Sequence, residues 1–203
     1  MKQIIIAIGR EFGSGGHIIA QKLAEHYNIP LYHKELLSQV AKDGGYSEEM
    51  IERYDERPIS LSFMPMPIVG SAISIEQDVA IKQFEFLRKK ANEEKESFVV
   101  VGRCADEILA DNENMTSVFV TSDKESKMKR VMEREGIDEK AALSKMKKMD
   151  KVRKTYHNFY CENKWGDSRG YDLCIRTGNI PLEKVTDVII KSVSYTHLTL
   201  PTI

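Results

Sequence analysis

The opening of the chain constrains the fold most, because a short apolar run leads directly into a glycine-rich segment and then an amphipathic one. Residues 4–8 hold four isoleucines and one alanine, which is typical of a strand buried on both faces. Gly13, Gly15 and Gly16 then predict a tight loop, and the apolar residues of 17–27 recur at helical spacing. We therefore expect a strand, a glycine-rich loop and a helix, in that order.

The rest of the chain alternates in the same way. Further strands are expected at residues 31–32, 97–101, 116–120 and 173–175. Helices are expected at 34–42, 75–94, 104–110, 123–134, 138–160 and 182–191, and residues 43–71 read as a helix fragment around 48–57 followed by a long loop. Strands that alternate with helices predict an α/β fold, with a parallel central sheet covered on both faces.

Length and composition exclude several classes of protein. A chain of 203 residues suffices for one domain of ordinary size, and a net charge of -1 argues against a nucleic-acid coat or a polybasic membrane binder. No apolar run approaches the ~18 residues that span a bilayer, and the apolar start is too short for a signal peptide. The cysteines Cys104, Cys161 and Cys174 are irregularly spaced, which favours a reduced, cytoplasmic setting without a zinc site.

The glycine-rich loop is the first candidate site. A loop between a buried strand and a helix exposes backbone N–H groups beside the positive end of the helix, which suits a phosphate group. The loop holds Arg10, Gly13, Ser14, Gly15, Gly16 and His17. A complete phosphate loop carries a lysine after its last glycine, and Gly16 stands there instead. A tight turn without a ligand is the alternative.

The second candidate follows the strand at 97–101. Arg103 and Asp106 stand where ligands gather in parallel sheets, at the carboxyl end of a strand. An arginine there can hold a phosphate with its fork of donors, although Arg103 could instead pair with Asp106 for structural reasons. Cys104, with no His–carboxylate partner nearby in the sequence, is interpreted as a small buried residue.

Three arginines after the strand at 116–120 form the third candidate. Arg130, Arg134 and Arg153 lie in two highly charged helices, where most basic residues are expected to face solvent. Arginines so placed can stabilise the charge of a migrating phosphoryl group. A packed loop anchored by Trp165 is expected further on, with His26 and His157 at the surface.

Together these segments resemble the cytidylate kinase-like family, a branch of the nucleoside monophosphate kinases. The resemblance is carried by residues 6–16, 100–106, 164–173 and 175–178, which follow one another in the family's order. It implies a three-layer P-loop kinase-like fold over residues 1–191, with a nucleotide-binding insertion at about 33–95 and a lid at about 138–165. It also implies transfer of the ATP γ-phosphoryl group to CMP or dCMP, with Mg²⁺ bridging the phosphates.

The resemblance also implies roles for the candidate residues. Residues 13–16 would cradle the donor phosphates, Arg130 and Arg134 would precede the lid, and Arg153 would lie within it. Arg10 and Arg103 would line the cleft, and Arg10 could replace the missing lysine. The partners expected are small nucleotides rather than nucleic acid or membrane.

Two other functions stay open. Without the phosphate-loop lysine, the protein could bind nucleotides as a regulator and not turn them over. The Met- and Pro-rich residues 63–67 could alternatively form a pocket for a different small acceptor.

The C-terminal end differs in composition from the rest. Residues 192–203 hold no Lys, Arg, Asp or Glu, and residues 193–202 match a one-frame translation of a transposase-end sequencing adaptor. We expect this tail to be non-native, a terminal strand being the structural alternative.

Overall fold

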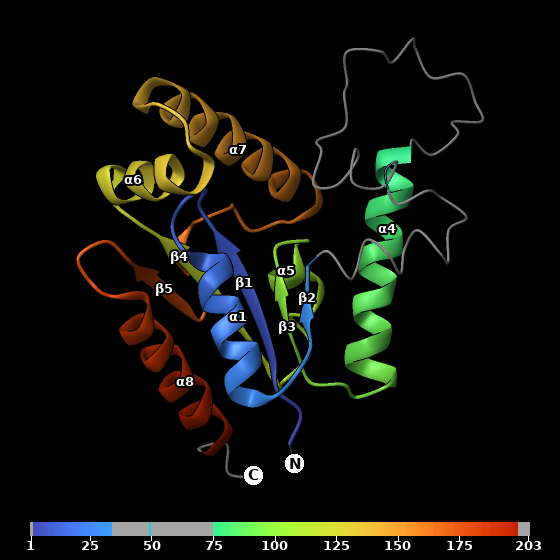
Figure 1. Ribbon diagram of the computed structural model, residues 1–203. Helices are drawn as coiled ribbons and strands as arrows, with labels where there is room; N and C mark the ends of the chain where they lie inside the picture. The colour runs from blue at the N-terminus through green and yellow to red at the C-terminus, as the bar shows by residue number, and fades with distance from the viewer. Residues whose placement is uncertain (1, 34–48, 50–74, 199–203) are drawn as a thin grey trace, which may run out of the picture.

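The computed structural model describes residues 2–33, 49 and 75–198. These residues form a five-stranded sheet in the order β2-β3-β1-β4-β5, in which every neighbouring pair is parallel (Figure 1). The strands are β1 (Ile5–Arg10), β2 (Leu31–Tyr32), β3 (Phe98–Val101), β4 (Met115–Thr121) and β5 (Leu173–Arg176). The parallel α/β architecture expected from the sequence is confirmed.

The central strand β1 explains the arrangement of the layers. All six of its residues are buried, and successive side chains point to opposite faces of the sheet. Ile6 and Ile8 belong to one apolar cluster, whereas Ile5 and Ala7 belong to another. The β-branched run therefore serves two cores at once.

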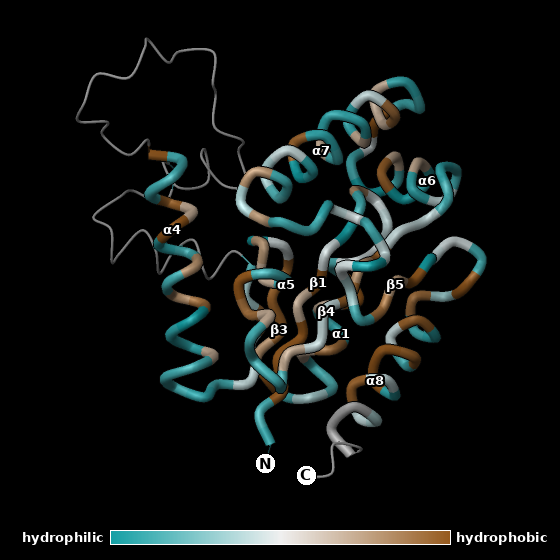
Figure 2. The backbone as a smooth tube through the Cα atoms, turned by 180° about the vertical axis from the view of Figure 1, so that it is seen from behind, coloured by the Kyte–Doolittle hydropathy of each residue, from teal (hydrophilic) through white to brown (hydrophobic). Residues whose placement is uncertain are grey.

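Helices cover both faces of the sheet. On the Ile6 face lie α1 (Gly16–Tyr27) and α8 (Leu182–Leu198), which pack through residues such as Leu23 and Ile189. On the opposite face lie α4 (Ile75–Arg88), a π-helical turn (Lys89–Glu93) and α5 (Ala105–Ile108). Figure 2 shows the apolar strands enclosed between these helices.

Two further helices lie beyond the carboxyl end of the sheet. They are α6 (Lys124–Glu135) and α7 (Glu139–Tyr160), which stand above β1 and β4 in Figure 1. Each begins at an aspartate whose carboxylate accepts a backbone N–H, Asp123 for α6 and Asp138 for α7. A short 3₁₀ turn (Ser168–Gly170) precedes β5.

The end of the chain differs from the expectation. Helix α8 continues through Leu198, and Val193 is fully buried in the Ile6 core, so a terminal strand is wrong for residues 192–198. The buried residues Val185, Ile189 and Val193 recur at helical spacing, one on each successive turn, so they all face the same core. That the tail is non-native stays a prediction.

Several expectations lie outside the described residues. They are the helix at 34–42, the fragment at 48–57 and the loop at 63–67, and the division into insertion and lid stays a prediction. Within the residues that are described, no helix is both long and apolar enough to cross a bilayer.

Candidate nucleotide-binding site

The glycine-rich loop joins the end of β1 to the first turn of α1. Gly13 and Gly15 have φ angles of 81° and 89°, in the left-handed region that favours glycine. A Cβ atom on Gly15 would lie 2.7 Å from Leu182 Cδ2. The Ser14 side chain is fully buried, and its hydroxyl donates to the Glu11 carbonyl at 2.8 Å. The loop is therefore fixed beside the N-terminus of α1, where a phosphate binds favourably.

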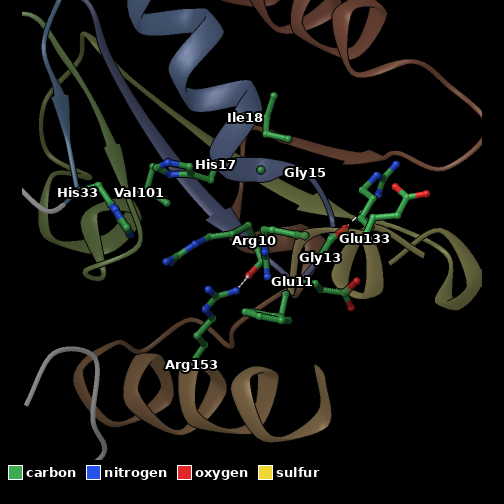
Figure 3. Close-up of a pocket in the computed structure, with 14 residues that line it drawn as sticks. Arg10, Glu11, Gly13, Gly15, His17, Ile18, His33, Val101, Glu133 and Arg153 are labelled. Carbon is green, nitrogen blue, oxygen red and sulfur yellow. Dashed lines mark hydrogen bonds between the residues drawn. The ribbon is translucent and has the colours of Figure 1, made fainter. Parts of the chain in front are cut away.

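A pocket of about 600 Å³ opens beside this loop (Figure 3). Four of the predicted arginines line it, and they come from the loop and from both outer helices. These arginines are Arg10, Arg130, Arg134 and Arg153. The other lining residues are Glu11, Phe12, Gly13, Gly15, Gly16, His17, Ile18, His33, Val101 and Glu133. The structure thus brings most of the predicted site residues to one pocket.

Arg10 occupies the space that a side chain at position 16 would need. A Cβ atom on Gly16 would lie 2.7 Å from Arg10 Cβ and 3.2 Å from Arg10 Cγ. In Figure 3 the Arg10 side chain runs past the loop into the pocket, toward His17 and His33. The rings of His17 and His33 are 4.8 Å apart. A cationic side chain therefore enters the pocket from position 10 rather than from position 16.

Arg130 ties the loop to the end of the sheet. Its Nη1 lies 3.1 Å from the Gly13 carbonyl, and 3.3 Å from the hydroxyl oxygens of Ser122 and Thr177. The Thr177 hydroxyl in turn donates to the Ser14 carbonyl at 2.8 Å. These contacts engage the Gly13 and Ser14 carbonyl oxygens and so fix the conformation of the loop.

Phe12 orients the arginines of the outer helices. The guanidinium carbons of Arg134 and Arg153 lie 4.8 Å and 5.5 Å from the centre of its ring. The ring itself packs with Val131 and Met146, and Arg153 Nη1 also donates to the Arg10 carbonyl at 3.4 Å. Cation–π contact with one anchored ring therefore holds two arginines from different helices near the loop.

An ion-pair cluster joins the loop to the same two helices. Lys127 Nζ on α6 lies 3.0 Å from Glu11 Oε2 and 3.7 Å from Asp150 Oδ2 on α7. Asp150 also accepts the Phe12 N–H at 2.6 Å. Burial raises the pKa of Asp150, against the opposing effects of that hydrogen bond and the charge of Lys127. The loop and both helices are thus connected by polar contacts as well as by Phe12.

Arg103 and Asp106 lie in an adjacent, smaller cavity of about 20 Å³. Arg10 and Arg153 form the boundary, since they line both spaces. Arg103 is 1% exposed, and both it and Cys104 adopt left-handed backbone conformations with φ of 60° and 55°. Such strain in non-glycine residues concentrates at functional sites. Because Arg103 lines only the small cavity, it lies beside the main pocket rather than in its lining.

Asp106 forms a buried pair with His157. His157 Nε2 and Asp106 Oδ2 are 2.7 Å apart, and both side chains are buried. Burial disfavours the imidazolium, but hydrogen bonds with Asp106 and Cys161 and their negative charges outweigh it and raise the pKa of His157 to about 10. The expectation that His157 lies at the surface is wrong, whereas His26 is exposed as expected.

A signal for the burial of His157 was present in the sequence. His157 follows the buried Met146 by eleven residues, about three helical turns, and so shares the inner face of α7. Cys104 is buried as expected, yet the fold places this Asp–His pair beside it in the lining of the small cavity.

The pocket fits the phosphates of ATP better than it fits a preformed metal site. The glycine cradle, the N-terminus of α1 and the arginines suit a polyphosphate, which a Cβ atom at position 15 or 16 would disturb. Among residues 2–33, 49 and 75–198, no three His, Cys, Asp or Glu side chains are grouped as metal ligands. Glu11 and Glu133 are the carboxylates in the lining, so a magnesium ion would depend on phosphate oxygens and water for most of its ligands.

The fold and the loop define the class of protein, and solved structures show the same architecture. A shikimate kinase from Bacteroides thetaiotaomicron has a TM-score of 0.55 at 12% identity, covering 94% of this chain and 98% of its own. A gluconokinase from Sinorhizobium meliloti has a TM-score of 0.53 at 14% identity, covering 96% and 93%. The chain therefore has the fold of the P-loop kinases.

The sequence places the chain more narrowly within that class. Residues 5–179 match the cytidylate kinase-like family, and the chain belongs to it. An uncharacterized protein from Eubacterium ventriosum is 60% identical, with a TM-score of 0.76 and coverage of 95% of this chain and 99% of its own. No curated protein sequence matches the chain.

The Phe12 contacts generate a first prediction. Replacing Phe12 with Leu keeps an apolar side chain in the core but removes the ring face that Arg134 and Arg153 contact. Because one cation–π contact contributes about 0.5–2 kcal/mol, we expect affinity for ATP to fall about 2- to 30-fold in isothermal titration calorimetry. Phe159→Leu, at an exposed aromatic outside the pocket lining, is the matched control. Unchanged affinity in Phe12→Leu would contradict the role of the ring.

The Asp106–His157 pair generates a second prediction. A histidine whose pKa is raised from 6.5 to about 10 stabilises the fold fully below its unfolded pKa and loses that effect as pH rises toward 10. The free energy of unfolding of the wild type, relative to His157→Gln, should therefore decrease between about pH 7 and pH 10. Urea denaturation at several pH values measures it, with His26→Gln as the exposed control. A difference that is constant with pH would show that the imidazole is neutral.

Proposed function

We propose that the protein is a phosphotransferase that moves the γ-phosphoryl group of ATP to CMP, dCMP or a similar acceptor, with Mg²⁺ bound to the donor phosphates. The observation that carries the proposal is the entry of Arg10 into the pocket through the space beside Gly16. In phosphate loops a lysine at that position contacts the transferred phosphate. Here a guanidinium on the neighbouring strand end supplies the charge.

The donor side of the reaction is supported by the loop. Its N–H groups and the N-terminus of α1 suit the β- and γ-phosphates of ATP, and Arg130 holds the loop in the conformation that presents them. Phosphoryl transfer depends mainly on positioning and on neutralising the equatorial oxygens. Four arginines around one pocket meet both needs.

The acceptor side is supported by family membership and by the arginines of α6 and α7. Arg134 and Arg153 line the pocket beside the Phe12 ring, where they can contact the phosphate groups of both donor and acceptor. A nucleoside monophosphate carries such a group next to its nucleophilic oxygen. CMP or dCMP is the acceptor that the family description favours.

The alternative is a cytoplasmic regulator that binds nucleotides without turnover. The specific observation that favours it is the glycine at position 16, since Arg10 delivers its charge along a different path from a loop lysine. Every 1.36 kcal/mol of lost transition-state stabilisation slows the reaction tenfold. A small misplacement of the guanidinium would thus leave binding intact and abolish useful turnover.

An acceptor panel separates these functions. Purified protein is given ATP and Mg²⁺ with CMP, dCMP, UMP, AMP or GMP, and ADP release is measured in a coupled assay. We expect turnover to be fastest with CMP or dCMP, and Arg10→Ala to lower kcat/KM about 10²- to 10³-fold. Arg169→Ala, an exposed arginine outside the lining, should leave it unchanged.

The remaining outcomes are also decisive. Nucleotide binding by calorimetry without turnover on any acceptor would contradict the kinase and support the regulator. Neither turnover nor binding at millimolar nucleotide would contradict both functions.

A further inference from the structure

Two of the three cysteines meet beside the small cavity. Cys104 lies three residues after the end of β3 and is 2% exposed, and Cys161 directly follows α7 and is 7% exposed. Both belong to one apolar cluster with Ala80, Phe84 and Tyr156. Cys174, on β5, is exposed and lies outside this cluster. Fifty-seven positions of sequence separate the buried pair, so only the fold brings them together.

The surroundings of the pair favour a thiolate on Cys161. Its hydrogen bond with the Cys104 thiol and the neighbouring His157 imidazolium lower the pKa of Cys161 to about 7, against the opposing effect of burial. Asp106 keeps that imidazolium charged through the 2.7 Å contact. At Cys174, burial and the charge of Asp167 raise the pKa instead. Because the thiolate is the nucleophile, Cys161 is the more reactive thiol at neutral pH.

We infer that Cys104 and Cys161 are a redox-sensitive thiol pair, which a peroxide oxidises to an intramolecular disulfide. The Cys161 thiolate attacks one oxygen of hydrogen peroxide, breaks the O–O bond and becomes a sulfenic acid while hydroxide leaves. The sulfur of Cys104 then attacks Cys161 Sγ, the S–O bond breaks, and the hydroxyl group leaves as water with the thiol proton. Two thiols lose two electrons, and one peroxide is reduced to two water molecules.

The geometry indicates why this site matters more than an isolated cysteine. A low-pKa thiol beside a second, resolving thiol is typical of redox sensors, and disulfides in reducing compartments are mainly transient ones of this kind. Cys104 lines the small cavity and shares an apolar cluster with Cys161, so we expect only a small oxidant such as peroxide to reach the pair from there. The larger oxidants of thiols, such as oxidised glutathione, would meet two buried sulfurs.

The disulfide would fasten the end of α7 to the loop after β3. Arg153 lies eight residues before Cys161 on α7, about two helical turns away, and Arg103 directly precedes Cys104. The crosslink would therefore bind together the two segments that contribute these arginines to the small cavity. This inference does not depend on the proposed kinase activity.

Peptide mapping after mild oxidation tests the proposal without any substrate. The full chain is treated with a small excess of hydrogen peroxide at pH 7, free thiols are alkylated under denaturing conditions, and tryptic peptides are analysed by mass spectrometry. We expect a crosslinked pair of peptides containing Cys104 and Cys161, lighter than the sum of the two by two hydrogen atoms. Cys174 should remain reduced and alkylated, and dithiothreitol should reverse the crosslink.

Serine variants provide the matched controls. Cys174→Ser should oxidise as the wild type does, whereas Cys104→Ser should stop at a sulfenic or sulfinic acid on Cys161. Circular dichroism checks that each variant is folded. If a variant is not folded, the peptide map of the wild type decides the test by itself. Oxidation first at Cys174, or loss of the Cys161 thiol without a Cys104 crosslink in the wild type, would overturn the proposal.

Discussion

The close packing of Arg10 against Gly16 is the contact on which the site depends. A Cβ atom at position 16 would lie 2.7 Å from Arg10 Cβ, so the two positions cannot both carry a long side chain in this backbone. The buried β1 strand fixes where Arg10 leaves the sheet, and the glycine loop fixes where α1 begins. The chain lacks the loop lysine at position 16, but the side chain of Arg10 brings a positive charge into the same pocket.

The loop and the two outer helices form a connected unit around that contact. The ring of Phe12 makes cation–π contacts with Arg134 and Arg153. Lys127 forms ion pairs with both Glu11 and Asp150. A movement of α6 or α7 must therefore break contacts to the loop or carry the loop with it. This coupling gives the arginines of the helices a fixed position relative to the proposed donor phosphates.

The sequence predicted the parallel sheet well because β1 and β3 are almost purely apolar runs, typical of strands buried on both faces, and because strands alternate with helices along the chain. The resemblance to the cytidylate kinase-like family implied that Arg10, Arg130, Arg134 and Arg153 share a site, and all four line one pocket. The burial of His157 was missed although the residue falls on the same face of α7 as Met146, because its partner Asp106 lies 51 positions away in the sequence. Nor did the sequence separate Arg103 from the main pocket, since the position of Arg103 depends on the strained turn at Arg103 and Cys104.

The helical path of residues 192–198 follows from packing of Val193 on the core, which outweighs the strand preference of the tail.

An exchange of the two positions tests the central claim most directly. Gly16→Lys, Arg10→Gly and the double variant are compared with the wild type by calorimetry with ATP and by kcat/KM, after circular dichroism has shown that each is folded. If Arg10 replaces the loop lysine, each single variant should lose function. The double variant should recover at least about tenfold over Arg10→Gly, because glycine at position 10 removes the Cβ and Cγ atoms that approach position 16. A double variant no better than Arg10→Gly, or a Gly16→Lys variant as active as the wild type, would contradict the account.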